Sequence, residues 1–213
     1  MIIPSLHARI LGIAIAAASG LACGQDLSGL PGTQIGWASE AFATNFMADG
    51  ITTFEQAIAG GASIRFELGT FATGFDPRTA TPADCVANWI VLQGADYNTG
   101  DQQVIETATL SSNSTPFGIN AQAYIWGFTS KEIDPDSQWV LMAATAWKWP
   151  DSNSPLPSTY SVSDALPTDV IFGSVNPISD AYHMQFSYVA IPEPSSSLLA
   201  VTALIGIAWR RRR

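Results

Sequence analysis

The side chains that could do chemistry are few in this 213-residue sequence, and none lies in a recognisable active-site motif. Once a predicted signal peptide is removed, His183 is the only histidine, and no G-x-S-x-G elbow is present to expose a nucleophilic serine. His183 and Cys85 are too few for a tetrahedral zinc site, which usually needs three or four such ligands. The sequence therefore favours a protein that is not an enzyme, with His183 as an ordinary strand residue.

Paired carboxylates are the remaining catalytic candidates, because glycosidases use two of them. The acidic residues considered are Glu67, Glu106, Glu132, Asp134 and Asp136. Glu67 alternates outward on a predicted strand, as on a solvated face. Asp134-Pro135-Asp136 offers hard oxygen ligands for Ca²⁺, but it lacks the EF-hand pattern and is typical of a turn. A secreted carbohydrate-active hydrolase stays an alternative, and no cofactor is expected beyond this one possible Ca²⁺ contact.

Tryptophans are the most distinctive side chains of the central region, which holds six of the seven. Aromatic residues favour strands and bury large areas, so we expect most of them in a core. Exposed aromatic faces would instead suit stacking on sugars. Trp147 and Trp149, next to a proline-rich loop, and Trp126 are the candidates for that role. A carbohydrate-binding module is therefore a second alternative.

The N-terminal 24 residues predict a signal peptide. A weakly basic start precedes a short apolar stretch over residues 10–21, and small residues lead to a cut between Gly24 and Gln25. The stretch is shorter than the roughly 20 residues of a membrane span. An uncleaved anchor and a lipoprotein modified at Cys23 are the competing interpretations. We thus expect residues 1–24 to direct export.

The C-terminal 23 residues have three parts in a fixed order. The first is Pro192-Glu193-Pro194, which we expect to be extended and accessible because proline restricts its own φ and the residue before it. An apolar run over residues 198–209 follows, and it is short for a permanent span of roughly 17–25 residues. Four arginines, which would hold the end of the chain on the cytoplasmic side, close the sequence: Arg210, Arg211, Arg212 and Arg213. This order favours a short transmembrane helix that anchors transiently and is then cleaved, with a plain membrane anchor as the alternative.

This order resembles the PEP-CTERM sorting signal of Gram-negative bacteria, with Ile191 where the family usually has valine. The resemblance covers residues 191–213. It implies export, recognition of Pro192-Glu193-Pro194 by an exosortase-type membrane protease, and removal of the tail. It also implies release or attachment at the outer surface. Such proteins commonly accompany exopolysaccharide, which is therefore a candidate partner.

Residues 25–190, called the body below, hold four basic and 17 acidic residues, a net charge of −13. An acidic body excludes a sequence-independent nucleic-acid binder, which needs a basic face, and it fits a soluble extracellular domain. Cys85 would be its only cysteine. We expect Cys85 to be buried rather than paired between chains, because a free cysteine behaves as a small hydrophobe.

Period-two patterns and frequent turn residues predict a mainly β body, a single β-sandwich or barrel-like domain. In the first strand, Ile64, Phe66 and Leu68 should share one face. Helices are expected only at residues 38–48 and 53–59, the second ended by Gly60-Gly61. Eight strands are expected at residues 63–68, 88–92, 104–110, 121–128, 138–143, 146–149, 169–172 and 182–189.

Four phrases of the body resemble uncharacterised PEP-CTERM proteins of Verrucomicrobia and related bacteria. They lie at residues 66–71, 88–89, 123–127 and 147–150. This resemblance implies a shared fold and no assigned chemistry. We therefore expect an exported structural or interaction component of the cell surface or exopolysaccharide matrix.

Overall fold

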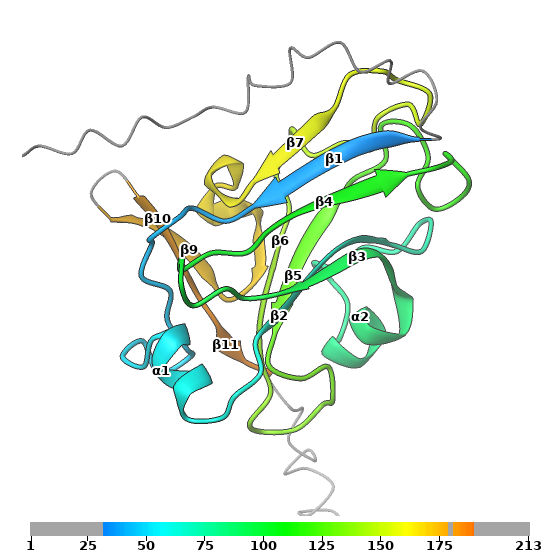
Figure 1. The fold of residues 1–213 in the computed structure, drawn as a ribbon. Helices are drawn as coiled ribbons and strands as arrows, with labels where there is room; N and C mark the ends of the chain where they lie inside the picture. Colours follow the sequence, from blue (N-terminus) through cyan, green and yellow to red (C-terminus); the bar gives the residue numbers. More distant parts are fainter. Residues whose placement is uncertain (1–31, 179–180, 190–213) are drawn as a thin grey trace, which may run out of the picture. The chain divides into compact units, whose positions relative to one another are not determined.

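The structure is a computed structural model that describes residues 32–178 and 181–189. Its strands form separate sheets rather than a closed barrel, and the expectation of a mainly β body is confirmed (Figure 1). The largest sheet has the order β11-β6-β5-β2-β3, with β8 also paired to β6. Its strands are β2 (Arg65–Phe71), β3 (Trp89–Asp96), β5 (Tyr124–Phe128), β6 (Gln138–Met142), β8 (Val170–Phe172) and β11 (Ser187–Tyr188).

Two smaller sheets complete the strands. One has the order β4-β1-β7 and consists of β1 (Thr33–Ala38), β4 (Ile105–Leu110) and β7 (Ser158–Ser161). The other pairs β9 (Ser174–Ile178) with β10 (Ala181–Gln185). The pairing of β1 with β7 is parallel, and every other strand pairing in the described chain is antiparallel.

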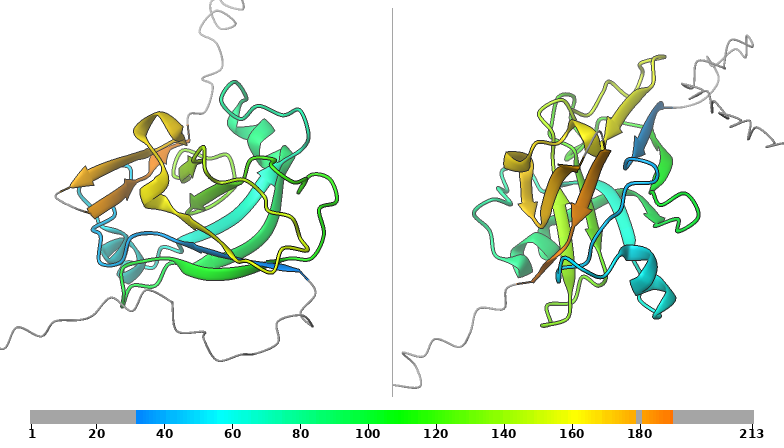
Figure 2. Two further views of the ribbon diagram at one scale, coloured as in Figure 1. Left: turned by 90° about the horizontal axis from the view of Figure 1, so that it is seen from above. Right: turned by 90° about the vertical axis from the view of Figure 1, so that its left-hand side faces the viewer.

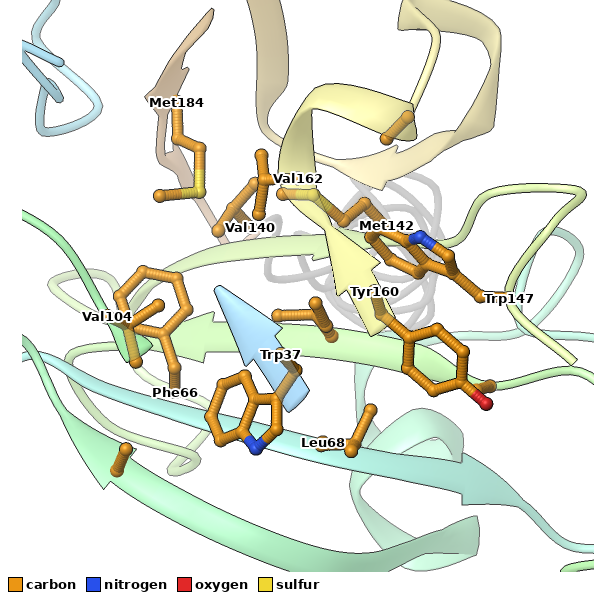
Figure 3. Close-up of a cluster of buried hydrophobic side chains, with 14 of the residues drawn as sticks. Trp37, Phe66, Leu68, Val104, Val140, Met142, Trp147, Tyr160, Val162 and Met184 are labelled. Carbon is orange, nitrogen blue, oxygen red and sulfur yellow. The ribbon is translucent and has the colours of Figure 1, made fainter. Parts of the chain in front are cut away.

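The main core lies between the large sheet and the β4-β1-β7 sheet. Phe66 and Leu68 of β2 are fully buried there, as is Ile64 just before the strand, so the predicted shared face is confirmed. Opposite them, β1 contributes Trp37. Figure 3 shows these side chains converging from several strands. The labelled members are Trp37, Phe66, Leu68, Val104, Val140, Met142, Trp147, Tyr160, Val162 and Met184.

The large sheet is buried on its second face as well. Helix α2 (Pro82–Asn88) lies on the side of β2 away from β1, as Figure 2 shows from above. Its Cys85 packs in a second cluster with Trp126, Trp139 and other aromatic side chains. We call this cluster the outer aromatic layer, with Phe71, Cys85, Trp126, Phe128, Trp139, Leu141 and Val189 as its buried members. Two covered faces explain why β5 and β6 are apolar at nearly every position.

The helix prediction was right in one place and wrong in another. Helix α1 (Phe54–Ala59) begins at a capping box between Thr53 and Gln56 and ends at Gly60, as expected. Residues 38–48 are not helical. Ala38 still belongs to β1, and Phe42 has a φ of 59°, which breaks any helix there.

Several strand boundaries also differ from the prediction. The segment 146–149 is not a strand, because Trp147 closes a turn on the Ala144 carbonyl. Strands β1, β7 and β9 were missed, and so was α2, whose capping box runs from Thr81 to Asp84. Two 3₁₀ turns, η2 (Val162–Asp164) and η3 (Pro167–Asp169), precede β8. No helix in the described part of the chain has the length and apolar character needed to span a membrane.

Close packing of β5 against β2 predicts that Gly127→Ala is destabilising. The methyl group would meet the Phe66 ring, which already fills the core. We expect a loss of about 1–3 kcal/mol in the free energy of unfolding, measured by guanidinium denaturation. Gly118→Ala is the control, because nothing lies within 4 Å of its added methyl group. Equal stabilities of the two variants would contradict the packing described.

Candidate functional site

The folded body holds the chain up to Val189, two residues before the predicted sorting signal begins at Ile191. Strand β11 pairs with β6. After it, the Val189 amide donates to the Ser137 carbonyl at 2.9 Å, and the Val189 side chain is buried in the outer aromatic layer. Asp134 fixes Ser137 in turn, because its carboxylate accepts from the Ser137 amide and hydroxyl, each at 2.8 Å. Pro192 follows only three residues after Val189.

The residues predicted for sorting and signal cleavage lie outside the described residues. They are Gly24, Gln25, Pro192, Glu193, Pro194, Arg210, Arg211, Arg212 and Arg213. The Asp134-Pro135-Asp136 segment is described, and its interpretation as a turn is confirmed. Asp134 accepts from the Asp136 and Ser137 amides, and these bonds, led by that from the Ser137 hydroxyl, lower the pKa of Asp134.

The three tryptophans proposed for glycan stacking are fully buried, each with 0% of its surface exposed. The expectation that Trp147 and Trp149 are exposed is therefore wrong. Their segment folds back along residues 120–123, since Ala123 donates to the Trp147 carbonyl and Trp149 to the Ala121 carbonyl. Both indoles contact Tyr160 in the main core. Trp126 packs edge-to-face on Trp139 at 4.8 Å in the outer aromatic layer.

Glu67 is also buried, at 8% exposure, so the expectation of a solvated carboxylate is wrong. It points to the second face of β2, which the outer aromatic layer covers. Its carboxylate accepts from the Trp89 indole at 2.7 Å and pairs with Lys131, while Arg65 lies 3.8 Å away. The Lys131 ammonium lies 4.8 Å from the Phe128 ring centroid and 5.3 Å from that of Trp126.

Glu67 is therefore held by an indole and two cations, which is the environment of a structural ion pair. The described residues hold no group of three or more His, Cys, Asp or Glu side chains placed to bind a metal ion.

His183 and Cys85 are both enclosed. The His183 ring meets Phe46 edge-to-face at 5.8 Å, and its Nδ1 has no hydrogen-bond partner within the described residues. Burial lowers the pKa of His183. Cys85 is 0% exposed, as expected. Burial, together with the negative charge of Asp84, raises the pKa of its thiol to about 11.

A cleft of about 200 Å³ opens where β2 ends. Sequence reasoning missed it, because its walls come from two segments that are distant along the chain. One wall is residues 70–75, and the other comes from the segment before and at the start of β5. The lining residues are Thr70, Phe71, Ala72, Thr73, Gly74, Phe75, Pro116, Ala121, Gln122 and Tyr124. All ten are uncharged, in a body whose net charge is −13.

A mainly β body that leads directly into a C-terminal signal defines a sorted, exported protein. The comparison with family models identifies the signal: residues 190–213 match the PEP-CTERM protein-sorting motif. The predicted resemblance of the tail is thereby confirmed, and the chain is a target of exosortase. No curated protein and no solved structure matches the chain. The resemblance of the body to verrucomicrobial-type proteins stays a prediction.

The Glu67–Lys131 pair generates a prediction about stability. Lys131→Met leaves a buried carboxylate short of a cation. We expect the free energy of unfolding to fall by about 2 kcal/mol. This value lies between the roughly 0–1 kcal/mol contributed by exposed ion pairs and the roughly 3–5 kcal/mol lost when a buried pair is broken. Lys148→Met is the control, because Lys148 is exposed and its ammonium donates to the neutral side-chain amide of Gln122. Denaturation curves that give both variants the same stability would contradict the structural role of Lys131.

The raised pKa of Cys85 predicts an inert thiol. We expect negligible alkylation of Cys85 by iodoacetamide in the native protein at pH 8, because almost no thiolate forms. Peptide mass spectrometry should show full labelling after denaturation in guanidinium. Rapid native labelling, or a disulfide-linked dimer through Cys85, would contradict the burial.

Proposed function

We propose that this chain is an exported structural or interaction component of the cell surface or exopolysaccharide matrix, processed at its C-terminus by an exosortase-type protease. The observation that carries the proposal is the sorting motif at residues 190–213, directly after the anchored Val189. In this proposal Pro192-Glu193-Pro194 is the recognition element. Arg210 to Arg213 retain the tail on the cytoplasmic side during a transient membrane insertion.

The short connection between body and signal limits where the protease can act. Three residues reach at most about 11 Å, so Pro192 stays within that distance of Val189. The protease must therefore bind its recognition element beside the folded body. The turn that holds Val189, built from Asp134 and Ser137, lies at this junction. If the body folds during export, the inserted tail would keep the junction at Val189 close to the membrane.

We also propose that the body is not an enzyme and that it needs no cofactor. Supporting this, Glu67 is engaged by Lys131 and Trp89, and Asp134 caps a turn. His183 contacts the Phe46 ring, and burial lowers its pKa. The charge of −13 supports a soluble role outside the cell, where like charges keep copies apart.

The proposal predicts the mass of the native protein purified from its own host. We expect intact mass spectrometry to show loss of the tail at least from Leu198 to Arg213, because cleavage near Pro192-Glu193-Pro194 removes it. Any excess over the trimmed mass would report an attached group. Wild-type protein that ends at Arg213 would overturn processing.

A variant pair tests the recognition element itself. Glu193→Ala should leave the tail on most molecules, because it removes the only charge of the tripeptide. Glu132→Ala is the matched control, since it removes an exposed charge from the body without changing the signal. Equal trimming of both variants would contradict recognition through Glu193.

A further inference from the structure

Aromatic side chains that pack on one another line the cleft at the end of β2. Phe71 is buried and stacks on Phe75 at 5.1 Å with an interplanar angle of 29°. Tyr124 meets Phe71 edge-to-face at 5.1 Å. Trp89 supports Phe71 from another side at 5.0 Å. Phe75 and Tyr124 line the cleft and are only half-buried, so a ligand can reach their rings.

The part of the cleft formed by Gln122 is fixed by hydrogen bonds. The Gln122 amide nitrogen donates to the Ala144 and Trp147 carbonyls, each at 2.9 Å, and its oxygen accepts from Lys148. Thr70 donates to the Gln122 carbonyl at 2.9 Å. A wall held in this way needs no reordering when a ligand enters, which lowers the entropic cost of binding.

Two hydroxyl groups of the lining remain available. Within the described residues, neither the Thr73 hydroxyl nor the Tyr124 hydroxyl makes a hydrogen bond, and Thr73 lies exposed on the turn beside Gly74. Gly74 has a φ of 83° and open space where a side chain would be, so the cleft stays open at this rim. The cleft therefore combines aromatic faces with hydroxyl donors and acceptors.

Charge and size narrow the ligand class. The ten lining residues are uncharged, and the charged groups that act on the Tyr124 hydroxyl, Asp76 and Arg78, have opposite signs. This balance favours a neutral ligand over an anionic or a cationic one. A volume of about 200 Å³ is below the roughly 300–1,000 Å³ of pockets for drug-sized ligands, so the cleft accommodates about one ring. The open rim lets the rest of a polymer continue outside. A neutral, hydroxylated ring with apolar faces matches all of these features.

We propose that this cleft binds one sugar residue of a neutral glycan, with Phe75 and Tyr124 as the stacking floor and Thr73 as a hydrogen-bonding residue. The inference deepens the proposed matrix role and rests on it for its biological setting. It moves the glycan contact from the buried Trp126, Trp147 and Trp149 to side chains that a ligand can reach.

The test uses the protein as purified from its host, probed with the methyl glycosides of glucose, galactose, mannose and N-acetylglucosamine. Ligand-observed saturation-transfer NMR should show binding of at least one of them and none of glucuronic acid. Tyr124→Ala should weaken that binding at least tenfold. Tyr188→Ala is the matched control, because this exposed tyrosine lies on β11 and should leave affinity unchanged.

A second variant guards against a folding defect in Tyr124→Ala. Thr73 is exposed on a turn, so Thr73→Arg should fold normally and still abolish binding by filling the cleft. Absence of binding by every neutral glycoside would overturn the proposal, and so would unchanged binding by Thr73→Arg or preferential binding of glucuronic acid. Tail removal is measured separately by mass, so failure of this proposal leaves the processing result intact.

Discussion

Burial of the central sheet on both faces is the constraint from which most other features follow. β2 lies between β3 and β5, and only its first residue is exposed. Phe66 and Leu68 fill the main core, while Glu67, which lies between them in the sequence, faces the outer aromatic layer. With Cys85 as a free thiol, the described body contains no disulfide. Its stability therefore depends on the burial of apolar surface, which contributes roughly 25 cal/mol per Å². The tryptophan side chains supply much of this buried surface.

This constraint also decides where the scarce positive charges go. A carboxylate on a covered sheet face must be paired, and Glu67 takes contacts from two of the four basic residues of the body. The other two contact neutral groups of the body, since Arg78 donates to the Thr168 carbonyl and Lys148 to Gln122. The surface is left strongly acidic. Such a surface disfavours anionic polymers and membranes at long range, and the uncharged cleft stands out against it.

The division between body and tail separates two kinds of function. The sorting motif is a linear signal at residues 190–213, and the body holds Val189 directly before it. Any ligand-binding role instead depends on the packing of the body, because fold alone assigns no activity. The cleft is one place in the described chain where packing leaves aromatic faces and hydroxyl groups accessible together.

What the sequence determined by itself is local or contiguous. The sorting motif, the period-two strands around Phe66 and the capped helix after Thr53 depend on neighbouring residues, so their patterns were readable. Residues 38–48 were misjudged because composition cannot reveal a backbone break such as that at Phe42. The burial of Glu67 was decided only by the tertiary structure, because one strand pattern suits one or two covered faces equally well. Trp147 and Trp149 are buried because their turn folds back along residues 120–123, a contact between segments that are distant in the sequence. The cleft joins residues 70–75 to Tyr124, which antiparallel pairing of β2 with β5 brings together across some 50 residues of sequence.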